Sequence, residues 1–369
     1  MRRWFELSIF VVLLAGLLAL VGCSSKKEDK PAPAPDAPKP ATATELNLLN
    51  FSEYIDEKIV ADFEKSANVR VRITTYESTE EMEGKLSYGG ADSQYDVVVA
   101  ASQAVPRLVR KDIIGPLDHA KLSNLKNLGA RFSGAAFDDG NKHAVPYQWG
   151  TAGIMYDKKK LPSLEPSWGA ILDTKNPAGT YVLLDEMRDM LGVVLKFKGH
   201  SSNSTSPDEI REAGRILQEA KANPKCLGFK GGIGAVQDVK AGSADIAVVW
   251  NGYALREVSE EKDRFAYIIP KEGSVMWMDT MVIPRRAPNR DLAHQFINFI
   301  LDAQIGGRLS TFTRYATPND AAKAHVPVAD QNNPVIYPTA DVLTRLESHR
   351  DLADTIKLFD ETWTSVKSR

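Results

Sequence analysis

Tyr95-Asp96-Val97-Val98-Val99-Ala100 is the stretch from which the fold class can be deduced. Its last four residues are all apolar, which is typical of a strand buried on both faces, because a half-buried strand alternates apolar and polar residues. Ile246–Trp250 is a run of the same kind, and further strands rich in apolar residues are predicted at Leu46–Asn50 and Val69–Ile73. Sheets covered on both faces are mostly parallel and flanked by helices, so these runs predict an α/β fold with parallel-rich sheets.

Amphipathic helices are predicted between these strands. The apolar residues of Asp56–Lys65 share one helical face. Ser206-Pro207-Asp208-Glu209 supplies an N-cap, a proline at the first helical position and first-turn acids, so a helix is expected to begin there. Two further helices are expected at Met187–Lys196 and Leu292–Leu301. The alternation of strands and helices supports the α/β prediction.

The start of the chain has the pattern of a secretory signal peptide. Arg2-Arg3 precedes an apolar run, Ile9–Val21, which is shorter than the ~20 residues of a membrane span. The run ends in small residues before Cys23, which resembles the lipobox of bacterial lipoproteins. The resemblance implies that residues 1–22 are removed and that Cys23 becomes a lipidated N-terminus. The alternative is an uncleaved anchor helix with an incidental cysteine.

The composition limits the possible functions of the rest of the chain. Residues 23–44 are rich in proline and alanine, which predicts an extended tether. Beyond this tether roughly 325 residues remain, more than one hydrophobic core usually serves, so two lobes are expected. The 46 basic and 48 acidic residues nearly balance, so the net charge gives no reason to expect nucleic acid as a partner.

Candidate binding residues follow the predicted strands, because ligands of α/β sheets bind beyond the carboxyl ends of the strands. The first strand continues into Asn50–Tyr54, and Ile246–Val249 continues into Trp250–Tyr253. Trp277 and Asp279 lie two residues apart, which places both side chains on one face of a strand.

The carboxylates Glu186 and Asp189 are three residues apart at the start of a predicted helix and would share one face. Taken alone, they are also explained as acids that complement the helix dipole. Trp250 alone is better explained as a core residue than as a binding residue. The Trp277 and Asp279 pair is more informative, because an aspartate within an apolar strand needs a polar partner.

Signatures of an enzyme are missing from the sequence. Its six histidines are scattered without a His-Glu-x-x-His motif, and its two cysteines do not form a zinc-binding pair. Gly231-Gly232-Ile233-Gly234 lacks the Walker lysine and the full dinucleotide fingerprint, and we predict a loop there. We therefore expect neither an enzyme nor a cofactor or a metal site.

Nine short segments resemble the polyamine-binding proteins of bacterial ABC importers. They keep the family's order from Leu46 to the C-terminus, and the ordered set carries the resemblance more than any single segment. The segments are Asn50–Tyr54, Thr75–Ser78, Tyr95–Val99, Pro146–Thr151, Ser167–Trp168, Trp250–Gly252, Pro270–Gly273, Trp277–Asp279 and Tyr315–Asn319.

The resemblance implies a periplasmic-binding-protein-like fold of type 2, with two lobes, a hinge and a ligand cleft between the lobes. The expected first lobe comprises residues 45–152 and 281–320, and the second comprises residues 153–280 and 321–369. It also implies an extracytoplasmic receptor that captures spermidine or putrescine and delivers it to a cognate ABC permease. We expect a monomer in the cell envelope, facing the periplasm or the exterior and touching the membrane only through its lipid.

The resemblance also assigns ligand-binding residues. Five match family binding positions in identity: Tyr54, Trp250, Trp277, Asp279 and Tyr315. Glu186 and Asp189 stand where the family has carboxylates, with aspartate and glutamate exchanged.

Some positions depart from the family. Phe51 stands where the family commonly has tryptophan, and Ala101 and Gln103 replace a hydroxyl-bearing pair. His349 falls near a position where some members carry glutamine. These departures leave open another small cation or an amino-acid-like ligand, or a sensing lipoprotein without a transport role. A bound anion would require arginines at the cleft, for which Arg188 and Arg314 are the candidates.

Overall fold

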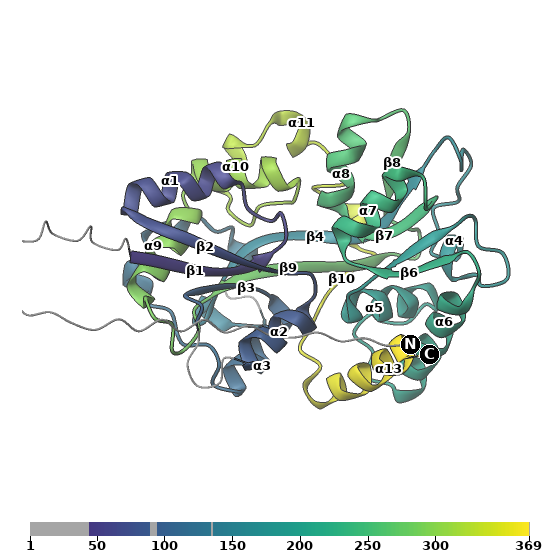
Figure 1. Ribbon diagram of the computed structural model, residues 1–369, viewed down its shortest axis with the longest axis horizontal. Coiled ribbons are helices and arrows are strands. Elements are labelled where there is room, and N and C mark those ends of the chain that lie inside the picture. The colour runs from purple at the N-terminus through teal and green to yellow at the C-terminus, as the bar shows by residue number, and fades with distance from the viewer. Residues whose placement is uncertain (1–43, 89–93, 134–135, 369) are drawn as a thin grey trace, which may run out of the picture. The chain divides into compact units, whose positions relative to one another are not determined.

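The computed structural model describes residues 44–88, 94–133 and 136–368 (Figure 1). The predicted signal peptide (1–22), the lipidation of Cys23 and nearly all of the predicted tether (23–44) lie outside these residues. Thr44, at the end of that tether, is the first residue of strand β1. Within the described residues, no helix has the length and hydropathy that a membrane crossing requires.

The strands of the described chain form one ten-stranded sheet, in the order β2-β1-β3-β9-β4-β7-β5-β6, with β8 paired to β4 and β10 paired to β9. The strands are β1 (Thr44–Phe51), β2 (Val69–Tyr76), β3 (Val97–Ala101), β4 (Ala144–Asp157), β5 (Tyr181–Leu184), β6 (Cys226–Lys230), β7 (Ile246–Trp250), β8 (Phe265–Ile268), β9 (Ser274–Val282) and β10 (Leu346–Ser348).

Helices cover the sheet on both faces (Figure 1). The α-helices are α1 (Glu57–Ala67), α2 (Thr79–Tyr88), α3 (Val105–Arg110), α4 (Gly169–Leu172), α5 (Met187–Phe197), α6 (Pro207–Ala222), α7 (Gly232–Ala241), α8 (Asn251–Glu260), α9 (Arg290–Ile300), α10 (Ala303–Thr313), α11 (Val328–Gln331), α12 (Ala340–Leu343) and α13 (Ile356–Ser368). Single 3-10 turns are η1 (Ser102–Ala104), η2 (His119–Lys121), η3 (Ser123–Asn127), η4 (Ala130–Phe132), η5 (Asp139–Asn141), η6 (Ala321–His325) and η7 (Ala353–Thr355).

Each of the two lobes is built on the strands at one end of the sheet. The first lobe is built on β1, β2 and β3, with α1, α2, α3, α9 and α10 around them, and the second is built on β5, β6 and β7, with α4 to α8 and α13 (Figure 1). The outer pairs β1–β2, β1–β3, β5–β6 and β5–β7 are parallel, as predicted. The long strands β4 and β9 pair antiparallel in the middle and continue into both lobes. The predicted residue ranges of the lobes stay a prediction.

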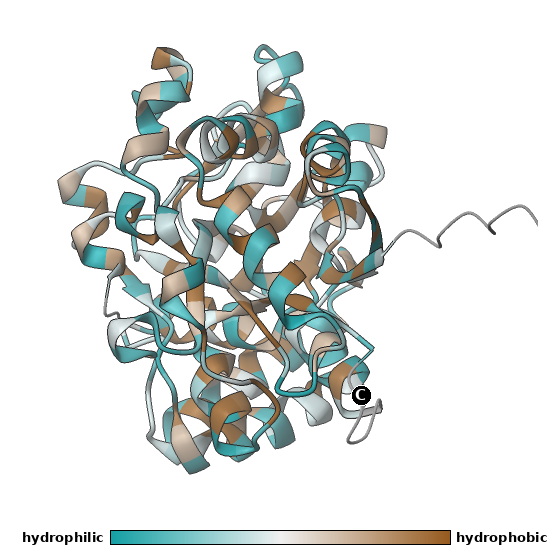
Figure 2. Ribbon diagram, turned by 90° about the vertical axis from the view of Figure 1, so that its left-hand side faces the viewer, coloured by the Kyte–Doolittle hydropathy of each residue, from teal (hydrophilic) through white to brown (hydrophobic). Residues whose placement is uncertain are grey.

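The local signals in the sequence account for the predicted helices. Asp56 caps α1, since its side chain accepts a hydrogen bond from the amide of Lys58 at 2.9 Å. Ser206 caps α6 in the same way, with Pro207 at the first helical position. Hydrophobic and hydrophilic residues alternate along the helices (Figure 2), and in α1 the apolar residues Ile59, Val60 and Phe63 are the buried ones.

The predicted loop at Gly231–Gly234 is wrong. Gly231 is the N-cap of α7, and the helix begins at Gly232. A Cβ atom on Gly232 would lie 2.6 Å from the ring of Tyr253 and 2.8 Å from that of Trp250. The glycine is therefore required by the close packing of α7 against these aromatic residues, which outweighs its low helix propensity.

A substitution at Gly153 tests how closely the central strand β4 is packed. A Cβ atom there would lie 2.4 Å from the hydroxyl of Tyr267 and 2.6 Å from the carbonyl oxygen of Ile268. We expect Gly153→Ala to lower the free energy of unfolding by about 1–3 kcal/mol, because overpacking forces the neighbouring backbone to shift. Denaturant unfolding measures this change.

Gly84 in α2 provides the matched control, since a Cβ atom there would have no neighbour within 4 Å. Gly84→Ala should leave the stability unchanged or raise it by up to about 1 kcal/mol, because alanine is the better helix former. Equal stabilities of the two variants would contradict the tight packing at Gly153.

Candidate functional site

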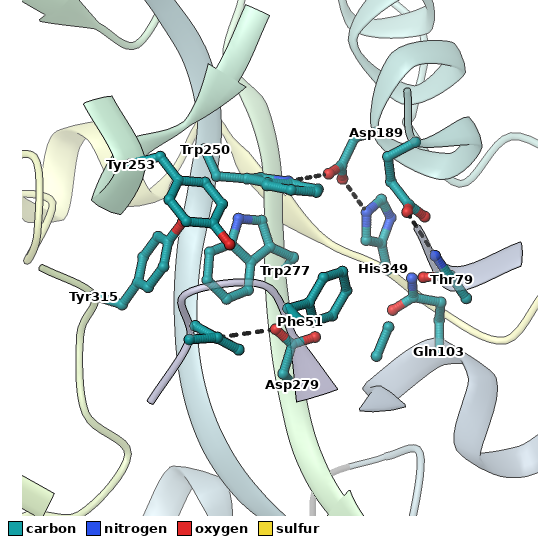
Figure 3. A pocket seen from close by; sticks show the side chains of 13 residues that line it. Phe51, Thr79, Gln103, Asp189, Trp250, Tyr253, Trp277, Asp279, Tyr315 and His349 are labelled. Carbon is teal, nitrogen blue, oxygen red and sulfur yellow. Dashed lines mark hydrogen bonds and ion pairs between the residues drawn. The ribbon is translucent and has the colours of Figure 1, made fainter. Parts of the chain in front are cut away.

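One cavity is lined by all nine residues that the sequence singled out for ligand binding (Figure 3). They are Phe51, Tyr54, Gln103, Glu186, Asp189, Trp250, Trp277, Asp279 and Tyr315, and the cavity is also lined by Thr79, Ala101, Tyr253 and His349. Most of them lie at or just beyond the ends of strands β1, β3 and β7 or along β9, as expected for an α/β sheet. Their binding role stays a prediction.

Aromatic rings form the walls of the cavity. The rings of Trp277 and Tyr315 meet edge to face with centroids 4.8 Å apart, and those of Tyr54 and Tyr315 do so at 5.5 Å. Phe51 comes from the first lobe and contacts Trp250 of the second lobe at 5.9 Å. Edge-to-face contacts fix the orientation of each ring, so the cavity has rigid apolar walls.

Asp279 is a buried carboxyl group without a cationic partner. The hydroxyl of Tyr54 donates to its Oδ2 at 2.9 Å. Burial raises the pKa of Asp279 to about 7, because the charged form loses its hydration. The hydrogen bond from Tyr54 opposes this shift, and the negative charge of Asp189 adds to it. Asp279 can therefore bind a proton or a cation at neutral pH.

Glu186 is the second buried carboxyl group with a raised pKa. Its Oε2 accepts a hydrogen bond from the amide of Thr79 at 3.0 Å, while its Oε1 is buried without a partner. Burial raises the pKa of Glu186 well above the ordinary value, and repulsion from Glu80 and Asp189 adds to the effect. Although Glu186 is the N-cap residue of α5, its side chain makes no capping bond. Helix capping therefore does not account for this carboxylate.

Asp189 is engaged by the protein itself. Its Oδ2 accepts a hydrogen bond from the indole nitrogen of Trp250 at 2.5 Å, and its Oδ1 lies 2.7 Å from Nε2 of His349 (Figure 3). Burial lowers the pKa of the His349 ring below its ordinary value, although Asp189 opposes this. A neutral ring that donates from Nε2 has its lone pair on Nδ1. Asp189 thus orients two side chains that line the cavity.

The polar atoms left without partners are mostly acceptors. Among the described residues that line the cavity, Oε1 of Gln103, Oε1 of Glu186 and Nδ1 of His349 are buried acceptors, and Nε1 of Trp277 is a buried donor. These lining residues include no lysine and no arginine. A ligand that fits this cavity therefore brings hydrogen-bond donors and positive charge.

The two arginines considered for an anionic ligand lie elsewhere. Arg188 donates to the carbonyl oxygen of Arg350 at 3.1 Å and lies against the ring of Phe359. Arg314 pairs with Asp330 at 2.6 Å. Neither lines the cavity, so the geometry gives no support to an anionic ligand.

Thr79 and His349 were not among the predicted binding residues, and Tyr253 was noted only as the end of the stretch Trp250–Tyr253. Thr79 follows a segment that did attract attention, Thr75–Ser78, so extending that segment by one residue would have found it. His349 gave a weaker signal, because it lies about 70 residues beyond β9 and reaches the cavity only through β10, which pairs with β9.

The raised pKa of Asp279 makes the stability of the ligand-free protein depend on pH. Its carboxyl group stays protonated up to pH about 7 in the folded state, but only up to about 4 in the unfolded chain. Between these values the folded state binds more protons, so its stability falls as the pH rises. Asp279→Asn removes this loss, and we expect the variant to unfold a few degrees above the wild type at pH about 8.

The difference between the two melting temperatures should shrink as the pH falls toward about 4, where Asp279 is protonated in both states. Thermal unfolding followed by circular dichroism measures it. Asp291→Asn is the control, because Lys121 lowers the pKa of this exposed carboxyl group and its removal should give no gain at high pH. A pH dependence identical in wild type and Asp279→Asn would contradict the burial of an uncompensated carboxyl group.

Comparison with known proteins gives consistent matches. The family described as bacterial extracellular solute-binding protein matches residues 58–335. Spermidine/putrescine-binding periplasmic protein 1 of Haemophilus influenzae is 30% identical over 341 residues, covering 92% of this chain and 94% of the relative. The putrescine/cadaverine-binding protein of Pseudomonas aeruginosa is 31% identical over 342 residues, covering 89% and 95%.

A solved structure agrees with these relatives. The putative spermidine/putrescine ABC transporter from Listeria monocytogenes is 33% identical and superposes with a TM-score of 0.80, covering 88% of this chain and 99% of the other. The match extends over both lobes and the cavity between them.

Proposed function

Because this chain belongs to the family of bacterial extracellular solute-binding proteins, we propose that its cavity captures a polyamine such as spermidine or putrescine and that the loaded protein delivers it to an ABC permease. The proposal is supported by relatives whose names specify spermidine, putrescine or cadaverine. The observation that carries it is the excess of buried acceptors, including Asp279 and Glu186, in a cavity lined by no lysine or arginine.

A polyamine supplies the positive charge and the hydrogen-bond donors that would pair with the acceptors of this cavity. Its ammonium groups donate hydrogen bonds and carry positive charge, and its methylene chain needs flat apolar walls. The rings of Trp250, Trp277 and Tyr315 offer such walls, and a cation over an aromatic face gains ~0.5–2 kcal/mol depending on desolvation. Asp279 and Glu186 would form short, charge-assisted hydrogen bonds with the ammonium groups.

Ligand capture and closure of the lobes are coupled through the same carboxyl groups. Burying an unpaired charge is unfavourable, so the empty closed cavity is disfavoured unless Asp279 and Glu186 are protonated. An ammonium group that pairs with them removes this penalty and stabilises the closed form. A micromolar dissociation constant corresponds to about −8 kcal/mol, within reach of two or three such contacts.

The positions that depart from the family are compatible with a polyamine as the ligand. Gln103 turns an acceptor toward the cavity, and Ala101 leaves space beside it. Phe51 supplies an apolar ring without an indole nitrogen. These features favour a ligand that donates a hydrogen bond near Gln103, which every linear polyamine can do.

We also propose the cellular setting. Cleavage before Cys23, lipidation of its thiol and the proline-rich tether of residues 23–44 would hold a monomeric receptor at the membrane surface, facing the periplasm or the exterior. Periplasmic relatives support the extracytoplasmic location. The lobe ranges of 45–152 with 281–320 and 153–280 with 321–369 belong to the same proposal.

Titration calorimetry with putrescine, cadaverine, spermidine and spermine tests the proposed ligand. We expect saturable one-to-one binding that persists at high salt, since a buried pocket is screened much less than the protein surface. 4-Aminobutyrate, which carries a carboxylate at one end, should give no heat of binding. A silent panel, or equal binding of 4-aminobutyrate, would overturn the polyamine assignment while leaving the fold intact.

The affinity for a polyamine should rise as the pH is raised from about 6 to about 8, because Asp279 must lose its proton to pair with an ammonium group. Titrations in buffers of different ionisation enthalpy should show that protons are released on binding. An affinity independent of pH would mean that Asp279 does not pair with the ligand.

Asp279→Asn should weaken the tightest-binding polyamine by well over tenfold, because losing one member of a buried charge pair costs about 3–5 kcal/mol. Asp291→Asn, which removes an exposed carboxylate paired with Lys121 at 2.6 Å, is the matched control and should bind like the wild type. Calorimetry of both variants at one pH measures the difference, and unchanged affinity of Asp279→Asn would refute its assignment.

A further inference from the structure

The two lobes are bonded to each other at one edge of the cavity. The hydroxyl of Tyr253 in α8 donates to the carbonyl oxygen of Ser52 at 2.6 Å. Nη1 of Arg256 lies 2.7 Å from Oε2 of Glu53, and its Nη2 donates to the carbonyl oxygen of Glu53 at 2.6 Å. We call Ser52, Glu53, Tyr253 and Arg256 the interlobe latch.

The interlobe latch lies directly beside the cavity. Ser52 and Glu53 form the turn after β1, and the residues on either side of this turn, Phe51 and Tyr54, both line the cavity. Tyr253 lines the cavity as well (Figure 3). A shift of the turn would therefore move two cavity walls of the first lobe at once.

The conformation of the turn suits its contact with Arg256. The backbone of Glu53 has a φ angle of 51°, in the left-handed region that residues other than glycine rarely adopt. This residue offers both its side chain and its carbonyl oxygen to the same guanidinium group. The double contact is a physical reason for the turn to keep a disfavoured backbone conformation in the closed form.

Arg256 is held in place before it reaches the first lobe. Its guanidinium group lies over the rings of Tyr253 at 5.4 Å and Phe312 at 5.0 Å. Its side chain is only 22% exposed, whereas that of Glu53 is 58% exposed. A shielded and oriented guanidinium group loses less entropy on pairing than a free surface arginine does.

We propose that Arg256 is a positioning residue for ligand capture: it fastens the turn after β1 to α8 when the lobes close, and so sets how long the ligand stays bound. This inference rests on the proposed function as a solute receptor but not on which solute is captured. Arg256 does not line the cavity and acts through Glu53, Phe51 and Tyr54.

Stopped-flow tryptophan fluorescence tests the proposal, since Trp250 and Trp277 line the cavity and report its occupancy. With putrescine or spermidine as the probe, we expect Arg256→Gln to dissociate about fivefold faster or more, with an association rate close to that of the wild type. Glu53→Gln should act in the same direction. The double variant should be no worse than the stronger single variant, because both remove one interaction.

Arg308→Gln is the matched control. Arg308 in α10 pairs with Asp62 in α1 at 2.7 Å, so this ion pair lies within the first lobe and is similarly short. Its removal should leave both rates unchanged. High salt should reduce the difference between wild type and Arg256→Gln, because screening weakens a partly exposed ion pair. Unchanged dissociation from Arg256→Gln, or an effect that merely follows a lower melting temperature, would overturn the proposal.

A measurement without ligand separates this proposal from the polyamine assignment. Spin labels at Lys58→Cys and Glu260→Cys, both exposed and on opposite lobes, report lobe closure once Cys23 and Cys226 are replaced by alanine. Electron–electron double resonance should show fewer closed molecules for Arg256→Gln than for the unchanged latch. If polyamines fail to bind but this difference in the fraction of closed molecules remains, the role of Arg256 is supported and the assignment of a polyamine as the ligand is refuted. Identical distance distributions would refute the latch.

Discussion

Two buried carboxyl groups, which pair with no cationic side chain among the described residues, impose the main energetic constraint on this protein. Asp279 and Glu186 are removed from water by aromatic rings and by closure of the two lobes, and burial raises the pKa of both. A buried acid must be neutral or paired, so these two groups require either a bound proton or a cation beside them. The chemistry of the ligand, the pH dependence of stability and the preference for an open or a closed form all depend on this one constraint.

Much of the fold could be predicted because its signals are local. Continuous apolar runs identified β3 and β7, and stretches rich in leucine or valine identified β1 and β2. Capping residues such as Asp56 and Ser206 marked where helices begin. Most of the nine candidate residues meet at one cavity because they follow strands whose ends converge. Trp277 and Asp279 lie along β9 instead, and Tyr315 follows α10. The pairing of Trp277 with Asp279 was informative because a strand turns alternate side chains to the same face.

Features that depend on tertiary contacts could not be predicted from local patterns. Gly232 begins α7, contrary to the predicted loop, because two aromatic rings leave no room for a Cβ atom. The sequence suggested Asp189 as a ligand carboxylate, but it cannot show that the indole of Trp250 and the ring of His349 already engage both of its oxygens. The ion pair between Glu53 and Arg256 joins residues more than 200 positions apart, and no pattern in the sequence connects them.

The pairing of strands that lie far apart in the sequence also determines when the chain can fold during its synthesis. β3 pairs with β9, so the sheet of the first lobe remains incomplete until residue 282 has been synthesised, and α9 and α10 come later still. The segment before β9 therefore cannot complete this sheet by itself while the rest of the chain is still being synthesised. A protein that crosses a membrane in the unfolded state has to fold late. A sheet that is completed only by its last strands delays folding in this way.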